Sequence, residues 1–211
     1  MKFHNSNSKV DVLRHRTVVA MLLAILLSVG AAQASEPAAT PIGDAVSFSA
    51  TGVDGKAYAV PANSARATVL IFILHDCPIC NRYAPEIGRI AAEYGKHNVS
   101  TFVVYEDSDV TPAQARLHAK EYGLTCGLLY DPRHVLARRV GAVATPEAVV
   151  LEAGGSPVYR GRIDDRFRGC GIGAVGEPAS RDLRASLDSV LKGVMPQPAR
   201  TSVVGCAIPL D

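Results

Sequence analysis

Residues 67–96 read ATVLIFILHDCPICNRYAPEIGRIAAEYGK, and the architecture expected for the whole chain follows from them. The apolar run from Ala67 to Leu74 has the length of a strand that is buried on both faces. Between Pro78 and Lys96 the apolar residues recur at spacings of 4, 4, 3 and 4, which predicts an amphipathic helix. They are Ile79, Tyr83, Ile87, Ile90 and Tyr94, and the opposite-charge pairs on the other side are formed by Arg82, Glu86, Arg89 and Glu93. A buried strand therefore leads through Cys77-Pro78-Ile79-Cys80 directly into a helix.

Strands and helices alternate along the rest of the chain. Further strands are expected at 99–105, 127–130, 148–151 and 157–163, and further helices at 111–122, 134–140 and 180–193. Upstream, Asp54-Gly55 favours a tight hairpin within 45–60 that caps a sheet edge, and Gly154-Gly155 separates the last two strands as a second hairpin. The pattern predicts an α/β fold with a central mixed sheet flanked by helices, without an internal repeat.

The first 34 residues are expected to direct secretion. Basic residues precede the apolar run from Val18 to Ala32, and Ala32-Gln33-Ala34 supplies the small residues that a signal peptidase requires. The run is shorter than the roughly 20 residues of a membrane span, so cleavage after Ala34 is favoured over an uncleaved anchor. We therefore expect a signal peptide (1–34), one globular domain (35–193) and an extended tail (194–211), with no membrane span in the mature chain and a periplasmic or secreted location.

Charge and composition exclude one large class of function. The chain has 211 residues, of which 48% are apolar and 20% charged, enough to build one sizeable core. Its formal charge is +2, but residues 1–34 contribute four basic residues against one acidic residue, which leaves 18 basic against 19 acidic residues afterwards. The domain therefore has no net basic charge with which to bind nucleic acid.

All five cysteines lie beyond residue 34: Cys77, Cys80, Cys126, Cys170 and Cys206. Secretion makes disulfide chemistry available to each of them, and their odd number leaves at least one without an intramolecular partner. The preferred pairing outside the CxxC is a structural link between Cys170 and Cys206 that ties down the tail, with unpaired thiols as the alternative. Cys126, at a strand start, is expected to be a small buried residue.

The Cys77-x-x-Cys80 spacing at the start of a helix favours redox chemistry. A thiol at the N-cap faces free backbone N–H groups and the positive end of the helix dipole, which lower its pKa. An accessible thiolate attacks disulfides, and a second cysteine one turn later can close a disulfide with it. Two alternatives stay open: a zinc site, which needs two more ligands that no second cysteine pair supplies, and an inert disulfide, for which so short a loop is a poor staple.

The segment from about Ala67 to Lys192 resembles the thioredoxin superfamily. The resemblance rests on the CxxC followed by Ala84-Pro85, and on a segment at 140–146 that ends in Thr145-Pro146 and precedes an apolar strand. The surplus at 107–130 indicates an inserted strand and helix, which is similar to the redoxin branch of TlpA-like and AhpC/TSA-like proteins. The resemblance implies that Cys77 is the nucleophile, Cys80 the resolving thiol, and Pro146 a cis-proline whose neighbour Thr145 receives an extended client.

The chain departs from its relatives at positions near the cysteines. The peroxidase branch has Pro and Thr or Ser where this chain has Leu70 and Leu74, which argues against efficient peroxide reduction. Thioredoxins have a buried Asp and a Trp where this chain has Ile71 and Asp76, and a carboxylate at Asp76 is expected to oppose ionisation of Cys77.

Other polar residues have competing interpretations. His75 either shuttles protons and stabilises the Cys77 thiolate, or is a solvated or backbone-bonded loop residue. The segment 162–165 either lines the site or is solvated surface. Tyr83 lies on the apolar stripe of the helix and is expected in the core.

These observations favour a thiol-disulfide oxidoreductase that needs no cofactor and no metal. Its partners are protein thiols or disulfides, and a reducing role requires electrons from a membrane donor. Two alternatives are kept: a copper or haem assembly factor that uses Cys77, Cys80 and His75 as ligands, and a thiol peroxidase.

Overall fold

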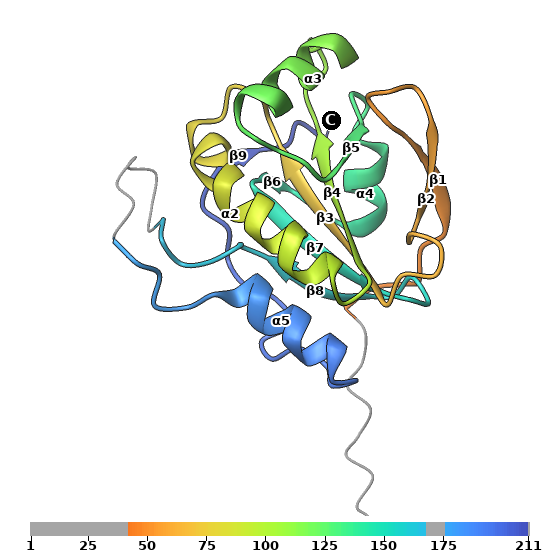
Figure 1. Cartoon of the computed structure of the whole chain (residues 1–211), viewed down its shortest axis with the longest axis vertical. Coiled ribbons are helices and arrows are strands. Elements are labelled where there is room, and N and C mark those ends of the chain that lie inside the picture. Colours follow the sequence, from red (N-terminus) through yellow and green to blue (C-terminus); the bar gives the residue numbers. More distant parts are fainter. Residues whose placement is uncertain (1–41, 168–175, 211) are drawn as a thin grey trace, which may run out of the picture. The chain divides into compact units, whose positions relative to one another are not determined.

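The computed structural model describes residues 42–167 and 176–210, which belong to one compact unit, Ala39–Asp211. Its centre is a five-stranded sheet in the order β5-β4-β3-β7-β8 (Figure 1). The strands are β3 (Ala67–Ile73), β4 (Val99–Tyr105), β5 (Gly127–Tyr130), β7 (Glu147–Glu152) and β8 (Pro157–Gly161). β3 pairs parallel with β4 and antiparallel with β7, so the predicted mixed sheet is confirmed.

Strand β3 supplies both layers of the core, because its side chains alternate between the two faces of the sheet. Val69, Ile71 and Ile73 join a cluster on one face, while Leu70 and Phe72 join a cluster on the other. Every residue of β3 is buried. The prediction of a strand covered on both faces is therefore confirmed.

Four helices cover the sheet within the described residues. They are α2 (Pro78–Gly95), α3 (Pro112–Glu121), α4 (Val135–Val140) and α5 (Asp182–Leu191). Buried residues of α2, α3 and α5 join the first core cluster, and those of α4 join the second. The inserted strand and helix expected at 107–130 are α3 and β5. The helix ends follow the predicted signals: Thr111 forms a capping box with Gln114, and Gly141 ends α4 in the left-handed region.

The N-terminal hairpin lies against the edge of the central sheet. Strands β1 (Phe48–Thr51) and β2 (Ala57–Val60) pair antiparallel around a turn in which Gly55 has a φ of +79°. The backbone N–H of Val53 donates to the carbonyl of Leu128 at 3.0 Å, which joins the turn to β5. The expected hairpin that caps a sheet edge is confirmed.

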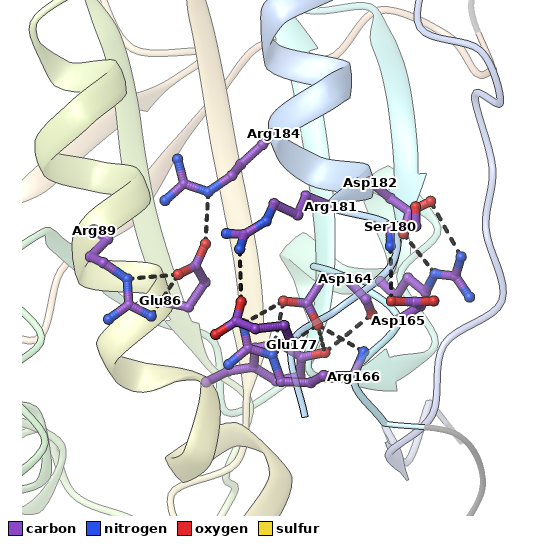
Figure 2. Close-up of polar contacts among 12 residues, drawn as sticks. Glu86, Arg89, Asp164, Asp165, Arg166, Glu177, Ser180, Arg181, Asp182 and Arg184 are labelled. Atoms are coloured by element: carbon purple, nitrogen blue, oxygen red, sulfur yellow. Dashed lines mark hydrogen bonds and ion pairs between the residues drawn. The ribbon is translucent and has the colours of Figure 1, made fainter. Parts of the chain in front are cut away.

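One helix face differs from the prediction. Glu86 is buried in α2, although the charged residues of this helix were expected on its outer side. Its carboxylate lies between Arg89 and Arg184, with distances of 2.7 Å to each guanidinium (Figure 2). Arg184 belongs to α5, which packs over this part of α2 and converts a surface position into a buried ion pair.

The C-terminal tail does not run free of the domain. Its strand β9 (Cys206–Ala207) pairs antiparallel with β6 (Ala144–Thr145). The next residue, Ile208, is 5% exposed and belongs to the second core cluster. An extended segment was expected here, but a partner for it was not.

The N-terminal segment that we interpret as a signal peptide lies outside the described residues, so its role stays a prediction. Among residues 42–167 and 176–210, no helix combines the length and apolar character needed to cross a membrane.

Candidate active site at the start of helix α2

Cys77 is the N-cap residue of α2, with extended backbone angles and Pro78 in the first turn. The structure therefore places the CxxC where the sequence predicts it, between β3 and the helix. The pKa of Cys77 is lowered to about 5, and the hydrogen bond with the thiol of Cys80 is the largest cause. Burial opposes this shift, while the backbone N–H groups of Cys80 and Ile79 and the thiol of Cys206 add to it.

Cys80 has the opposite ionisation behaviour. Burial is the main cause that raises the pKa of Cys80 well above its ordinary value, and the nearby Cys77 thiolate raises it further. At neutral pH, Cys77 is therefore a thiolate, while Cys80, one helical turn later, is a protonated thiol.

Asp76, whose carboxylate was expected to oppose ionisation of Cys77, does not decide the direction in which the pKa of this thiol is shifted. Asp76 is exposed to solvent. The pKa of Cys77 still falls to about 5, so the groups around this thiol outweigh the charge of Asp76. The expectation that the Cys77 thiol is accessible is wrong, because Cys77 is 2% exposed.

The Thr145–Pro146 segment lies beside the cysteine pair. The peptide bond between Thr145 and Pro146 is cis, as the resemblance implied, and the carbonyl oxygen of Thr145 is 3.9 Å from the Sγ of Cys77. Cys77, Cys80, Thr145 and Pro146 therefore belong to one site, although 68 residues separate Cys77 from Thr145.

Sequence reasoning missed the carboxylate that supports this segment. Glu147 is 3% exposed, and its Oε2 accepts hydrogen bonds from the backbone N–H groups of Val143 at 2.7 Å and Ala144 at 3.2 Å. The Nε of Arg160 lies 3.5 Å from the other carboxylate oxygen. An acidic residue directly after the Thr-Pro pair was the available signal, but its burial depends on contacts from β8.

His75 pairs with a carboxylate. Its Nδ1 is 2.8 Å from Oδ1 of Asp107, and its backbone N–H donates to the same carboxylate at 3.1 Å. The hydrogen bond to Asp107 is the main cause that raises the pKa of His75. The structure thus gives this loop histidine a buried acidic partner that neither sequence interpretation included.

A second histidine continues this polar chain behind the helix start. The side-chain amide of Asn81 donates to the carbonyl of His75 at 3.1 Å, and its oxygen is 2.9 Å from Nε2 of His118. Burial lowers the pKa of His118. Asn81 and His118 are further residues that the sequence analysis did not single out.

Three more sequence interpretations can be compared with the structure. Tyr83 is a core residue, as expected, and its hydroxyl donates to Oδ1 of Asp164 at 2.6 Å. Asp164 is only 3% exposed and is paired with Arg166, so the segment that contains it is not simply a solvated strand end (Figure 2). Cys126 is partly exposed and packs against the first core cluster, and burial raises its pKa to about 11.

Cys206 approaches the cysteine pair from the tail. Its Sγ is 3.6 Å from the Sγ of Cys77, and both thiols are free. Cys170 lies outside the described residues, so the expected link between Cys170 and Cys206 stays untested, while the structure gives Cys206 a different neighbour.

Within the described residues, one group of side chains has the geometry that could hold a metal ion. Ligand atoms of His75, Asp76 and Asp107 lie within 4.8 Å of one another, and this group contains no cysteine. The ligand set imagined for a copper or haem assembly factor, which joins His75 to both cysteines, is therefore not assembled in this structure.

Comparison with known proteins agrees with the thioredoxin-like fold described above. The sequence model of the AhpC/TSA family matches residues 42–158, more than half of the chain. A conserved protein from Geobacillus kaustophilus is similar in structure, with a TM-score of 0.68 at 28% identity over 82% of this chain and 91% of that chain. A hypothetical protein from Sinorhizobium meliloti 1021 has a TM-score of 0.69 at 23% identity, over 83% and 97% of the two chains.

A protein of named activity shares the fold with lower structural similarity and lower sequence identity. It is a thiol-disulfide oxidoreductase from Bacteroides fragilis, with a TM-score of 0.50 at 19% identity over 56% of this chain and 89% of that chain. No curated protein matches the sequence. The sheet order, the flanking helices and the CxxC at a helix start define a thioredoxin-fold protein of the redoxin branch. With the family match over residues 42–158, the chain belongs to the AhpC/TSA family.

Proposed function

We propose that the protein is a thiol-disulfide oxidoreductase in which Cys77 attacks and Cys80 resolves. The opposed ionisation of the two thiols carries this proposal. A thiolate is the attacking species in disulfide exchange, and at neutral pH Cys77, with a pKa of about 5, supplies one. Cys80, whose pKa is raised by burial, holds its proton until the second step.

The exchange has two balanced steps. The Cys77 thiolate attacks one sulfur of a client disulfide, forms a mixed disulfide and releases the other client sulfur as a thiolate. Cys80 then attacks the Cys77 sulfur, which breaks the mixed disulfide and forms the Cys77–Cys80 disulfide. The proton of Cys80 passes to the client, which gains the two electrons that the pair loses. The reverse sequence oxidises a client.

An extended client segment is proposed to bind beside Thr145. In support, the backbone of Ala144 and Thr145 already pairs with an extended strand in β9, so this edge can accept one. The carbonyl of Thr145 lies 3.9 Å from Cys77, which would bring a client residue at this edge close to the nucleophile. The expected signal peptide favours clients in the periplasm, with a membrane donor for a reducing role.

The test is redox titration of the purified protein in glutathione buffers, read by alkylation and mass spectrometry. We expect the Cys77–Cys80 pair to interconvert reversibly, Cys77→Ser to abolish the exchange, and Cys126→Ser, a change at a cysteine away from the pair, to leave it intact. If the pair does not interconvert, or if its thiols respond only to added copper, the proposal fails. Peroxide consumption faster than disulfide exchange would favour a peroxidase instead.

A further inference from the structure

The tail that carries Cys206 is held on both sides of that residue. Before it, the backbone of Arg160 in β8 exchanges hydrogen bonds with Ala199 at 3.0 Å and Thr201 at 3.2 Å. After it, the N–H of Ile208 donates to the carbonyl of Val143 at 2.9 Å, and the Ile208 side chain is buried. Cys206 is therefore positioned by the fold.

The approach of the tail to the site depends on a glycine. A Cβ built on Gly205 would lie 1.9 Å from the carbonyl oxygen of Thr145 and 2.7 Å from its carbonyl carbon. Because both are backbone atoms, they cannot move aside as a flexible side chain would. In the next position Cys206 is paired with Thr145, whose hydroxyl donates to the Cys206 carbonyl at 3.4 Å. The tail thus lies directly on the edge that presents Thr145 to Cys77.

The thiols of Cys206 and Cys77 are close enough to react after a small movement. Sγ of Cys206 is 3.6 Å from Sγ of Cys77, and a disulfide bond is about 2.05 Å long, so a local shift of roughly 1.5 Å brings the sulfurs to bonding distance. Cys206 is exposed to solvent, while Cys77 is buried.

We propose that Cys206 is a third redox-active thiol, which exchanges with the Cys77–Cys80 disulfide while its strand occupies the edge beside Thr145. In this step the Cys206 sulfur attacks Cys77, the Cys77–Cys80 bond breaks, and a Cys77–Cys206 disulfide forms. Cys80 takes the electron pair of the broken bond and the proton that Cys206 loses, so no external oxidant is needed. The inference rests on the proposed function, because Cys77 must be exchange-active.

In this proposal the tail occupies the edge where an external client would bind, and Cys206 is the first thiol that reacts with the Cys77–Cys80 disulfide. An external client must displace β9 before it can pair with Ala144 and Thr145. The tail then covers the reactive sulfur, and when Cys206 attacks a mixed disulfide at Cys77 it releases the client thiol and leaves a Cys77–Cys206 disulfide.

The experiment uses Cys80→Ser protein, in which the resolving thiol is removed, treated with glutathione disulfide. Cys77 first becomes glutathionylated and releases one glutathione. Cys206 then attacks the Cys77 sulfur, expels the second glutathione and leaves a Cys77–Cys206 disulfide, which peptide mapping by mass spectrometry identifies. The matched control is the variant that carries both Cys80→Ser and Cys206→Ser, in which the glutathione adduct on Cys77 is expected to persist.

The outcomes separate the two proposals. If the adduct persists on Cys77 although Cys206 is present, or if Cys206 is found bonded to Cys170, the third-thiol proposal is wrong while exchange at Cys77 stands. If no adduct forms on Cys77 even in the double variant, exchange itself fails and both proposals fall.

A second variant tests the role of the strand without removing a thiol. Gly205→Ala should push β9 off Thr145, slow formation of the Cys77–Cys206 disulfide and speed alkylation of Cys77 by about tenfold, which corresponds to about 1.4 kcal/mol of lost tail binding. The control is Gly95→Ala at the end of α2, where an added Cβ meets nothing within 4 Å. Equal alkylation rates in the two folded variants would contradict occlusion by the tail.

Discussion

The Oε2 atom of Glu147 accepts a hydrogen bond from the backbone N–H of Val143 at 2.7 Å, across the turn that contains Pro146. The same atom also binds the N–H of Ala144, so one buried carboxylate holds the strand edge on which both the tail and Cys77 rely. The charge of Glu147 is balanced by Arg160 on the far side. The geometry of the candidate site therefore depends on a residue that reaches no sulfur.

Glu147→Ala is expected to lower the free energy of unfolding by about 3 kcal/mol, because it leaves two backbone donors and the Arg160 guanidinium without their acceptor. Denaturant titration measures the change. The control is Glu152→Ala at the other end of the same strand, where the side chain is partly exposed, and where a loss below about 1 kcal/mol is expected. Equal losses in the two variants would show that the Glu147 contacts add little.

The alkylation rate of Cys77 is expected to rise with pH through a midpoint near 5 and to stay level above it, since only the thiolate reacts. Cys80→Ala removes the largest cause of the lowered pKa and should move the midpoint upward, while Cys206→Ser should move it less. Pulsed alkylation with mass spectrometry separates Cys77 from Cys126, whose pKa is raised to about 11. A midpoint near the ordinary thiol value in the unchanged protein would contradict this ionisation.

Local patterns were sufficient to predict the strand β3, the helix α2 and the cysteine pair between them. Each depends on residues that are close in sequence, such as the apolar run from Ala67 and the recurrence of Ile87 and Ile90. The hairpin at Asp54-Gly55 was predicted for the same reason, since a turn needs particular residues at fixed positions.

Contacts between distant segments could not be predicted in this way. The two residues of β9 have no periodicity, and their pairing with Ala144 and Thr145 spans 61 residues. The helical pattern predicts that Glu86 is exposed, but Arg184 of α5 covers it and forms an ion pair with it. The acidic partner of His75 is likewise contributed by another strand end, at Asp107. Burial of charged groups is decided by the partners that the fold brings, which the sequence near each residue does not contain.

The reduction potential of the Cys77–Cys80 pair is expected between about −270 and −120 mV, the values of a strong reductant and a strong oxidant of this fold. A lowered nucleophile pKa stabilises the reduced form and raises the potential. The pKa of Cys77, at about 5, lies between the roughly 7 of the reductant and the roughly 3.5 of the oxidant. Equilibration with glutathione measures the potential, and a value below about −270 mV would contradict this link. Cys206→Ser serves as the comparison, because it removes the competing Cys77–Cys206 disulfide.

Glu106 provides a test that is independent of the sulfur chemistry. Burial is the main cause that raises its pKa to about 9, its Oε2 lies 2.7 Å from Nδ1 of His134, and its Oε1 is buried without a hydrogen-bond partner. Between about pH 4.5, where the carboxyl ionises in the unfolded chain, and pH 9, the folded state holds a proton that the unfolded state has released. The contribution of Glu106 to stability therefore falls as pH rises across this window, by at most about 1.4 kcal/mol per pH unit, while the lowered pKa of Cys77 contributes with the opposite sign.

Glu106→Gln keeps the shape of the protonated side chain and removes its titration. We expect this variant to be more stable than the unchanged protein at pH 8, and the difference between their free energies of unfolding to grow in favour of the variant from pH 5 to 8, measured by denaturant titration at each pH. Glu93→Gln, at an exposed position of α2, is the matched control and should leave the slope unchanged. If Glu106→Gln destabilises the protein equally at pH 5 and pH 8, the carboxyl of Glu106 is ionised in the folded state throughout this range, and the raised pKa of Glu106 is contradicted.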